Sequence, residues 1–545
     1  MAVIIIDIKQ IEKYIKITPE LLEKSRLMGA PMEIKGETVQ IEITPNRPDL
    51  LSMQGYLRAL KSFLGKEVGL KEYKINDGEK DYKIKIDKSV KLVRPFTACA
   101  IVKNLIFDDG RIREIIDLQE KLHATLGRNR KKVAIGIYPL EKITLPIRYE
   151  ARSPKDIKFQ PLGADGELNA LQILKKHPTG IEYAHLLEGK DKFPIFIDSK
   201  NKILSMPPII NSECIGKITQ ETKEVFVECS GFDFRILNKT LNIIVSTLIE
   251  MGGKAYKMEL NYEKKEITPD FKPETLKVNI ENVNNLLGLA LKEKDLDKLL
   301  PKMGYDYQNG MVKVPSWRTD ILHEVDIIED IAIAYGYDNI VPEIPKISTI
   351  GQEAWESKLQ NKLSEILVGL GLLEISSYHL IKDNEIKLDK TEEAIEILDS
   401  KTEYKILRPN LLISALRIFA ENKDNEYPQK IFEIGTVFKR DKDSETGTKE
   451  NENLMVAISP ANFTSLKQIL NYIENALGIK LELKEHFHKN LIEGRTASIS
   501  LNSKNIGYLG EVHPESLRSW SIKMPVAVLE ISLDSIFKEI NNPKD

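Results

Sequence analysis

Residues 316–340 read SWRTDILHEVDIIEDIAIAYGYDNI, and this stretch carries the clearest structural pattern in the chain. Its apolar residues recur at the spacing of one helix face, and we expect Gly336 to end the helix. The stretch closes a compact segment that begins near residue 271, so we predict a small separate domain there. The expected buried stripe of the helix is Ile327, Ile328, Ile331, Ala334 and Tyr335.

The same helix carries closely spaced carboxylates. Asp326, Glu329 and Asp330 stand at i, i+3 and i+4, so they share the face opposite the apolar stripe, and Asp320 lies just upstream. Neighbouring carboxylates about 6 Å apart repel by ~3 kcal/mol at an effective dielectric of about 20. A solvated acidic face near a helix N-terminus and a Mg²⁺ site are both compatible with this spacing. We expect Arg318 and His323, in contrast, to be structural.

Composition sets the class of protein. The chain has 545 residues, of which 42% are hydrophobic and 30% charged, which is typical of soluble globular domains. No apolar run approaches the ~18 to 20 residues needed to cross a bilayer, and the opening MAVIIIDIKQ predicts a first strand rather than a signal peptide. The net charge of -3 gives by itself no reason to expect RNA binding. Three cysteines without a CxxC pattern argue against a disulfide scaffold or a zinc site and predict a cytoplasmic protein.

The N-terminal end of the chain alternates between strand and helix signals. VQIEI at 39–43 has the apolar–polar alternation of a half-buried strand. The turn TPNRPDL at 44–50 follows, and we expect Asp49 to cap the helix beyond it. Arg47 is expected to pair with a nearby carboxylate and so to fix the turn. These signals predict an N-terminal α/β domain.

Polar or proline-bearing stretches divide the rest of the chain. They lie at 74–83, 262–277 and 342–348. Between the first two, short strand-like runs precede a long helix, which predicts a mixed α/β domain. The last part has the pattern of helices packed on antiparallel strands, with an exposed hairpin tip at 439–453. The predicted fold class is therefore multidomain α+β, with domains at 1–90, 91–270, 271–346 and 347–545.

The order of these motifs resembles that of phenylalanyl-tRNA synthetase beta subunits of the archaeal and eukaryotic type. The resemblance covers nearly the whole chain in the order of the family. It rests on ITPNRPDLLSMQGYLRALKSFLG, ILSMPPIINSE, TKEVFVECSGFD, the segment 316–340, LRPNLLISALRIFAENKDNEYPQKIFEIGTVF, GRTASISL and IGYLGEVHPE.

This resemblance implies a role for each domain. It implies an editing (B3/B4-like) domain at 91–270, a B5-like winged-helix-type domain at 271–346, and a class II synthetase-like antiparallel sheet domain at 347–545. It also implies an alpha subunit as partner, in a heterotetramer of two alpha and two beta chains, together with tRNA(Phe). Between the two interpretations of the acidic helix it favours magnesium, shared with the alpha subunit. The implied ligands are Asp320, Asp326, Glu329 and Asp330.

The C-terminal domain is expected to lack aminoacylation chemistry. KIFEIGTVFKRD looks like a remnant of the class II motif two, carrying Lys439 and Arg440, and no glycine-rich segment ending in arginine follows it as a motif three. Two cationic groups are needed to hold a triphosphate bent for transfer. We therefore interpret Lys439 and Arg440 as solvated charges at the base of a hairpin.

The resemblance locates hydrolysis of tyrosine mischarged onto tRNA(Phe) in the second domain. Glu228 is suited to accept a hydrogen bond from the tyrosine hydroxyl, because a polar pocket selects the side chain that carries the extra hydroxyl. Ordinary strand-edge residues remain the alternative interpretation. No Ser-His-Asp or Cys-His set is visible, so water is the expected attacker. The implied pocket residues are Phe196, Ser205, Asn211, Glu228 and Ser230.

Two further alternatives remain at the level of the sequence. GRNRKK at 127–132 is the densest basic run and suits phosphate contacts, although such runs are usually solvated loops. A free-standing RNA-binding or assembly protein would reuse the same domains without needing a second chain. The missing motif three argues against an autonomous synthetase.

Overall fold

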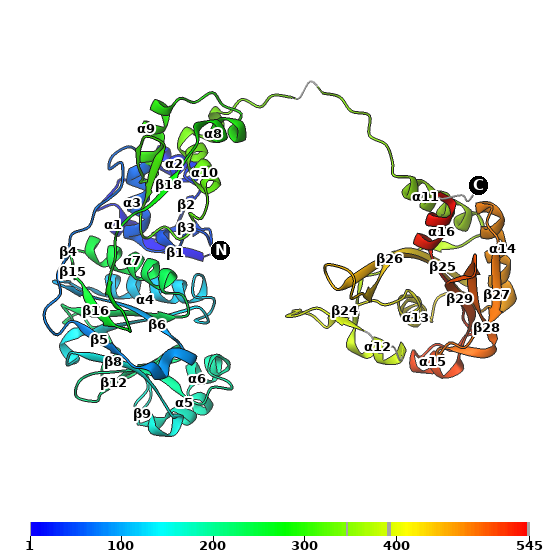
Figure 1. The fold of residues 1–545 in the computed structure, drawn as a ribbon, viewed down its shortest axis with the longest axis horizontal. Helices are drawn as coiled ribbons and strands as arrows, with labels where there is room; N and C mark the ends of the chain where they lie inside the picture. The colour runs from blue at the N-terminus through cyan, green and yellow to red at the C-terminus, as the bar shows by residue number, and fades with distance from the viewer. Residues whose placement is uncertain (1, 345–346, 390–393, 542–545) are drawn as a thin grey trace. The chain divides into compact units, whose positions relative to one another are not determined.

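The computed structural model describes residues 2–344, 347–389 and 394–541. Its chain divides into two compact units, residues 1–344 and 345–545, and both mix helices with sheets (Figure 1). The predicted connector 342–348 contains residues 345 and 346, which lie outside the described part. Over the described residues, no helix is long and apolar enough to cross a membrane.

The first unit begins with a three-stranded antiparallel sheet of order β1-β3-β2. The predicted alternation at 39–43 is confirmed, because Val39, Ile41 and Ile43 are buried on one face of β3. The elements are β1 (Ala2–Asp7), β2 (Met32–Lys35), β3 (Thr38–Ile43), α1 (Ile8–Ile11), α2 (Pro19–Leu27) and α3 (Met53–Phe63).

The turn after β3 corrects one prediction. Asp49 does not cap α3; Ser52 does, accepting a hydrogen bond from the N–H of Gly55 at 3.0 Å. The reason is a short 3₁₀ turn at Pro48–Leu50, which delays the start of the helix beyond the reach of Asp49. The carboxylate instead receives the two guanidinium hydrogen bonds of Arg47, at 2.9 and 2.8 Å, and this confirms the expected pairing of Arg47.

Two larger sheets follow, and a shared core lies between them. Tyr138 and Phe226 from the five-stranded sheet meet Tyr149 and Phe196 from the seven-stranded sheet in this core. Helices α4 and α7 cover the other face of the five-stranded sheet, on the side of β1 (Figure 1). The five-stranded sheet has the order β4 (Ile75–Asn76), β15 (Lys254–Tyr256), β6 (Phe96–Lys103), β14 (Val225–Gly231) and β7 (Val133–Pro139), with α4 at Asp109–Ala124 and α7 at Phe234–Glu250.

The seven-stranded sheet joins segments from distant parts of the first unit. Both β4 and β5 fall before residue 90, and they pair with strands of these two sheets. The order is β13 (Ile210–Asn211), β12 (Ile203–Met206), β11 (Phe193–Ile197), β8 (Ile147–Arg152), β5 (Lys83–Ile86), β16 (Met258–Asn261) and β17 (Lys265–Thr268). Beside it lie β9 (Lys158–Phe159), β10 (Leu168–Asn169), α5 (Ala170–Lys176) and α6 (Pro178–Tyr183).

The last part of the first unit packs helices on a small sheet of order β18-β20-β19. Helix α10 confirms the predicted stripe: Ile327, Ile328, Ile331 and Ala334 are buried, and the helix ends at Gly336 with a φ of 94°. The elements are β18 (Glu274–Lys277), β19 (Asp306–Gln308), β20 (Met311–Val314), α8 (Ile280–Leu287), α9 (Glu293–Lys302) and α10 (Glu324–Tyr335).

The second unit is built on another seven-stranded sheet, with helices on both faces. The predicted hairpin tip is confirmed, since β25 and β26 pair up to Arg440 and Thr448, and Lys439 and Arg440 are exposed there. The sheet order is β21 (Leu373–Glu374), β25 (Gln429–Arg440), β26 (Thr448–Ser459), β30 (Ala527–Ser532), β29 (Lys504–Val512), β28 (Leu491–Leu501) and β27 (Leu481–Glu485).

A smaller sheet of order β22-β24-β23 and several helices complete the described part of this unit. Helices α11, α14 and α16 contribute to the core on one face of the large sheet, while α13 and α15 contribute to the core on the other. The bounds are β22 (Leu380–Lys382), β23 (Ile395–Glu396), β24 (Tyr404–Leu407), α11 (Trp355–Gly369), α12 (Asp383–Asp389), α13 (Leu412–Glu421), α14 (Phe463–Leu477), α15 (Pro514–Ser519) and α16 (Leu533–Asn541).

Candidate functional site

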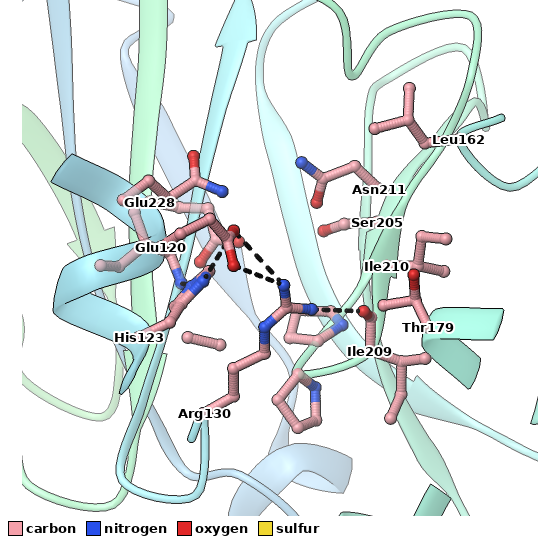
Figure 2. A pocket seen from close by; sticks show the side chains of 15 residues that line it. Glu120, His123, Arg130, Leu162, Thr179, Ser205, Ile209, Ile210, Asn211 and Glu228 are labelled. Carbon is pink, nitrogen blue, oxygen red and sulfur yellow. Dashed lines mark hydrogen bonds and ion pairs between the residues drawn. The ribbon is translucent and has the colours of Figure 1, made fainter. Parts of the chain in front are cut away.

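A pocket of about 150 Å³ lies where α4, edge strand β7 and the turn between β12 and β13 come together (Figure 2). Three of the five predicted pocket residues line it: Ser205 from β12, Asn211 from β13 and Glu228 from β14. Ser205 and Asn211 are direct partners across the β12–β13 pair. The other lining residues are Gln119, Glu120, His123, Arg130, Ala134, Ile135, Leu162, Thr179, Pro207, Pro208, Ile209 and Ile210.

Phe196 and Ser230 are not among the residues that line this pocket. Phe196 lies in the core and stacks on Tyr149, with ring centroids 4.4 Å apart. Ser230 is fully buried, and its hydroxyl accepts a hydrogen bond from Arg94 Nε at 3.1 Å. Ser230 stands two residues beyond Glu228 on the same strand, so its side chain is directed to the same face but farther along it. Both residues therefore support the pocket from the surrounding core.

Tyr138 is a functional candidate that the sequence did not identify. Its hydroxyl lies 3.2 Å from Glu228 Oε1 and 3.2 Å from Asn211 Oδ1. A hydroxyl has one hydrogen to donate, so it satisfies only one of these two oxygens at a time. Tyr138 therefore links Glu228 to Asn211 and holds the side-chain oxygens of both residues in position.

Glu228 is neutral at pH 7 in this environment. Only 2% of the residue is exposed, and burial raises the pKa of the carboxyl to about 8, although the Tyr138 hydroxyl and Arg94 partly offset the shift. Among the described residues, Glu228 Oε2 and Ser205 Oγ are buried without a hydrogen-bond partner. Unpaired polar atoms are rare in protein interiors and need an explanation. Arg130 Nε, also in the lining, is a third such atom. Several of them around one pocket are what a site for a polar ligand group contains before the ligand binds.

His123 has a structural role at the edge of the pocket. Its Nε2 accepts a hydrogen bond from the N–H of Ile135 at 2.8 Å, so the proton of the neutral ring is on Nδ1, which faces Glu120 at 3.3 Å. Burial lowers the pKa of His123 and keeps the ring neutral. Because both ring nitrogens are engaged, His123 is not available as a general base.

Gly136 makes room for the Tyr138 hydroxyl. Gly136 pairs with Glu228 across the sheet, and a Cβ at position 136 would lie 2.0 Å from Tyr138 Oη. We expect Gly136→Ala to displace the phenol and to lower the free energy of unfolding by about 1–3 kcal/mol, as overpacking does. Denaturant unfolding measures this. Gly166→Ala is the matched control, since its added Cβ has no neighbour within 4 Å, and an equal loss in both variants would contradict the steric explanation.

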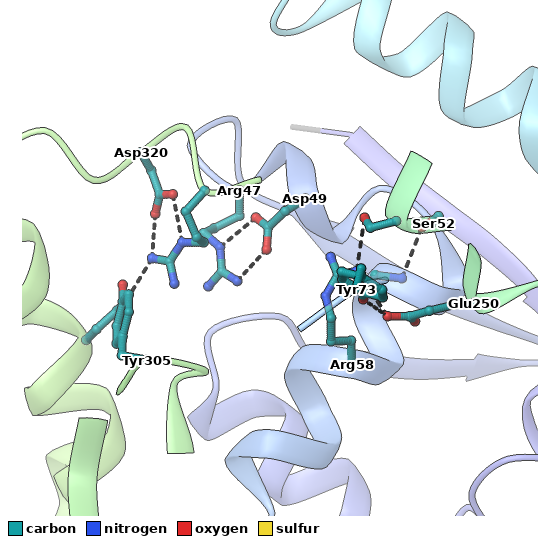
Figure 3. Close-up of polar contacts among 12 residues, drawn as sticks. Arg47, Asp49, Ser52, Arg58, Tyr73, Glu250, Tyr305 and Asp320 are labelled. Atoms are coloured by element: carbon teal, nitrogen blue, oxygen red, sulfur yellow. Dashed lines mark hydrogen bonds and ion pairs between the residues drawn. The ribbon is translucent and has the colours of Figure 1, made fainter. Parts of the chain in front are cut away.

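The predicted metal residues occupy three different environments. Asp320 accepts two hydrogen bonds from Arg318, at 2.8 and 2.7 Å (Figure 3). Asp330 accepts one from Arg318 at 2.7 Å and one from the Tyr305 hydroxyl. Asp330 is buried, which does not fit the alternative of a fully solvated acidic face. Its partner Arg318 is structural, as expected.

The other two carboxylates lie toward solvent. Asp326 Oδ2 accepts the N–H groups of Leu322 and His323, at 2.7 and 2.8 Å, and so caps α10 together with the His323 side chain. Glu329 is exposed. In the part of the chain that the structure describes, no three His, Cys, Asp or Glu side chains are placed to hold a metal ion together. While Arg318 binds Asp320 and Asp330, those two do not fit the role of direct ligands.

Sequence comparisons identify the family. The family described as "Phenylalanyl tRNA synthetase beta chain CLM domain" matches residues 340–533, and "tRNA synthetase B5 domain" matches residues 276–337. The phenylalanine–tRNA ligase beta subunit of Pyrococcus abyssi is 39% identical over 505 residues, which covers 90% of each chain. This chain belongs to the phenylalanine–tRNA ligase beta-subunit family. The Archaeoglobus fulgidus member is 36% identical over 95% of both chains.

A solved structure resembles a large part of this beta-subunit-family chain. It is an N-terminal fragment of the phenylalanyl-tRNA synthetase beta subunit from Pyrococcus horikoshii, with 35% identity and a TM-score of 0.58. The similarity covers 61% of this chain and 99% of the fragment. The predicted family is therefore confirmed, and so is the mixed multidomain α+β fold.

The interior of the C-terminal sheet of this beta-subunit-family chain holds paired charges. Arg408 is 1% exposed and binds Glu433 at 2.7 Å, while Ser377 donates to the same carboxylate. Glu530, also buried, accepts hydrogen bonds from Asn453 and from the backbone of Leu411. Lys439 and Arg440 are exposed at the end of the hairpin, as expected for solvated charges. Triphosphate binding requires converging cations, and these do not converge on the interior.

Proposed function

We propose that the pocket around Glu228 hydrolyses tyrosine from mischarged tRNA(Phe), and that the chain supports phenylalanine charging by an alpha subunit in an (alpha-beta)2 assembly. The observation that carries the first part is the pair of unpartnered buried atoms, Glu228 Oε2 and Ser205 Oγ. A tyrosine hydroxyl supplies one donor and one acceptor, and it can pair with both.

Discrimination against phenylalanine follows from the same pair. The neutral Glu228 carboxyl donates to the tyrosine oxygen, and the tyrosine hydrogen is donated to the Ser205 hydroxyl. Phenylalanine would leave both polar groups unpaired beneath its ring, and such a loss costs about 1–3 kcal/mol for each buried group. Phenylalanyl-tRNA(Phe) would therefore escape hydrolysis without being sterically excluded from the pocket.

The bond-breaking step is assigned to a water molecule. The lining contains no serine or cysteine paired with a free histidine, because His123 has both nitrogens engaged. The chain's contribution is then to hold the tyrosine side chain and orient the ester toward the attacking water. This agrees with the absence of a nucleophile pattern in the sequence.

The proposal includes magnesium, with two of the four predicted carboxylates as ligands. Asp326 and Glu329, on the solvent side of α10, would hold the ion together with waters and with groups of the alpha subunit. A bound ion would supply positive charge that joins the two chains at this acidic helix. The three free cysteines are consistent with the cytoplasm as the site of action.

Co-expression with a candidate alpha subunit tests the assembly. We expect phenylalanine charging only from the co-purified pair and none from either chain alone. Charging by this chain alone would contradict the inactive C-terminal domain. A stable chain that binds tRNA, with no charging in any combination, would favour the free-standing RNA-binding protein.

A further inference from the structure

Another pocket of the first unit lies where α3 meets the small domain that ends in α10. Its volume is about 160 Å³, and its lining comes from the segments 47–71 and 303–318. None of these residues lines the pocket around Glu228, so the two sites are separate. The pocket therefore joins two parts of the chain that are far apart in sequence.

The lining of this pocket carries more positive than negative charge. Its two carboxylates already have partners. Asp49 accepts the two hydrogen bonds of Arg47, while Glu67 accepts one from Lys61 at 2.8 Å and lies 3.7 Å from Lys71 Nζ. Against these two anions the lining has four cations, which leaves an excess of two positive charges. The four are Arg47, Arg58, Lys71 and Arg318.

Two of the arginines have a buried nitrogen without a partner. Among the described residues, Arg58 Nη2 and Arg318 Nη1 are both buried and make no hydrogen bond. Arg58 is 8% exposed and Arg318 is 2% exposed. A guanidinium has five N–H donors and no acceptor, so each free nitrogen can pair only with a group that accepts. Two such nitrogens on the lining of one pocket indicate a ligand rich in acceptor oxygens.

The other nitrogens of these arginines are held in place. Arg58 Nη1 donates to the Tyr73 hydroxyl at 3.0 Å and to Glu250 at 3.2 Å, and the guanidinium lies 4.5 Å from the centre of the Trp317 ring (Figure 3). Arg318 is held by the two aspartates described above. These carboxylates lie outside the lining and offset part of the positive charge. They also fix the arginines before a ligand arrives, which reduces the ordering cost of binding.

The positive charges act on the same place. Burial would raise the pKa of Asp49, but the charges of Arg47, Arg318 and Arg58 lower it below its usual range. Three guanidinium groups from two segments are therefore close enough to influence one carboxylate. Like charges gathered in this way repel one another, and a further anion between them would reduce the repulsion.

The size and the donors of the pocket select a small tetrahedral oxyanion. A phosphate group carries about −1.5 to −2 charges near pH 7, which matches the excess of two in the lining. Its oxygens accept hydrogen bonds from several directions, and guanidinium groups suit such oxygens. The volume is below the roughly 300–1,000 Å³ of sites for drug-sized ligands, so the site has room for a phosphate but not for a whole nucleotide.

We propose that this pocket binds a phosphate group, either free or at the end of a larger molecule, through Arg58, Lys71 and Arg318. The bound anion links the segment 47–71 to the segment 303–318. It thereby holds α3 against the small domain that contains α10. This role is independent of hydrolysis in the pocket around Glu228.

Calorimetric titration of the full chain with inorganic phosphate, at constant ionic strength, tests the proposal. We expect saturable binding with a half-saturation on the order of 1 mM and a Tm that rises with occupancy. Lys71→Gln should weaken the binding about fivefold, because Lys71 is partly exposed and contributes less than a buried cation. Arg58→Gln should abolish it, and circular dichroism establishes that this variant is folded.

Lys83→Gln is the matched control. Lys83, like Lys71, has a side chain that is 39% exposed and lies 3.7 Å from a glutamate, but it is outside the lining. It should leave phosphate binding unchanged. An equal loss in both lysine variants, or a response to phosphate that does not saturate, would overturn the site. The lysine pair decides this even if Arg58→Gln does not fold.

Adenosine 5′-monophosphate distinguishes the two sources of the phosphate. If the pocket takes the end of a larger molecule, the nucleotide should bind with a half-saturation similar to that of inorganic phosphate and compete with it. If the ligand is free phosphate, the nucleotide should not compete. In both cases Lys71→Gln should weaken the anion that binds, and Lys83→Gln should not.

Discussion

Replacing Glu228 with alanine is expected to reduce hydrolysis of tyrosyl-tRNA(Phe) on the order of 100-fold while leaving phenylalanine charging by the complex intact. The variant removes the group that pairs with the tyrosine hydroxyl and leaves the Tyr138 hydroxyl without its Glu228 partner. Loss of such buried pairing amounts to about 1–3 kcal/mol at the transition state. Deacylation of tyrosyl-tRNA and charging with phenylalanine, measured on the same preparation, separate the two activities.

Glu228→Gln distinguishes a neutral acid from a carboxylate. If the working form is the protonated carboxyl, the amide can donate in its place, and we expect the glutamine variant to retain activity within about tenfold. The unaltered protein should lose activity as the pH rises through about 8, where Glu228 ionises, while the glutamine variant should not respond there. Equal activity of the alanine variant and the unaltered protein would contradict the assignment of this pocket.

The raised pKa of Glu228 also makes the free energy of unfolding depend on pH. The pKa of Glu228 is raised above its ordinary value of 4.5, so between pH 4.5 and about 8 the folded state keeps a proton that the unfolded state has released. Stability of the unaltered protein therefore falls across this window relative to that of Glu228→Gln. The difference stops growing above about pH 8, and denaturant unfolding at pH 5, 7 and 9 records it.

Replacing Arg318 with methionine should destabilise the first unit by about 3–5 kcal/mol, because Asp320 and Asp330 are left buried without their counter-ion. Hydrogen exchange of the α10 amides measures the local loss of stability. Denaturant unfolding measures the change in the free energy of global unfolding. Arg235→Met is the control: its pair with Glu274 is 65% exposed on the arginine side, so the loss should remain below about 1 kcal/mol.

This variant also tests the magnesium prediction. If Asp320 and Asp330 are able to bind the ion, millimolar Mg²⁺ should restore part of the stability that Arg318→Met loses, because the ion replaces the guanidinium. If only Asp326 and Glu329 face it, added Mg²⁺ should have no such effect. Restoration in the variant would therefore return Asp320 and Asp330 to the ligand set.

Local patterns predicted much of the architecture. The buried face of α10, the alternation in β3 and the hairpin end at Arg440 follow from periodicity and from turn residues, which act over a few positions. Asp49 was wrongly predicted as a cap because an intervening 3₁₀ turn shifted the helix start by three residues, to the next available hydroxyl at Ser52. The residue at which a helix begins depends on the backbone geometry of the preceding turn, and the spacing of apolar and polar residues does not reveal that geometry.

The site depended on contacts that are distant in sequence. Helical spacing predicted one shared face for Asp326, Glu329 and Asp330, and it gave no sign that Arg318 and Tyr305 bind Asp330 in the interior. Tyr138 lies in an apolar strand, where the sequence gives no sign of a functional role. The pairing of β7 with β14 brings it close to Glu228. The basic run at 127–132 was visible, but nothing in the sequence showed that its Arg130 lines the pocket.

The buried ion pair of Arg408 and Glu433 makes the replacement of either residue alone costly. Each residue is at most 2% exposed in its side chain, so a mutation that removes either one leaves the other as an unpaired interior charge and destabilises the domain by several kcal/mol. Opening a cavity at this place would need at least two simultaneous replacements, because each single replacement destabilises the domain. An engineer who wants to place a new ligand site in this core would therefore have to replace Arg408 and Glu433 together.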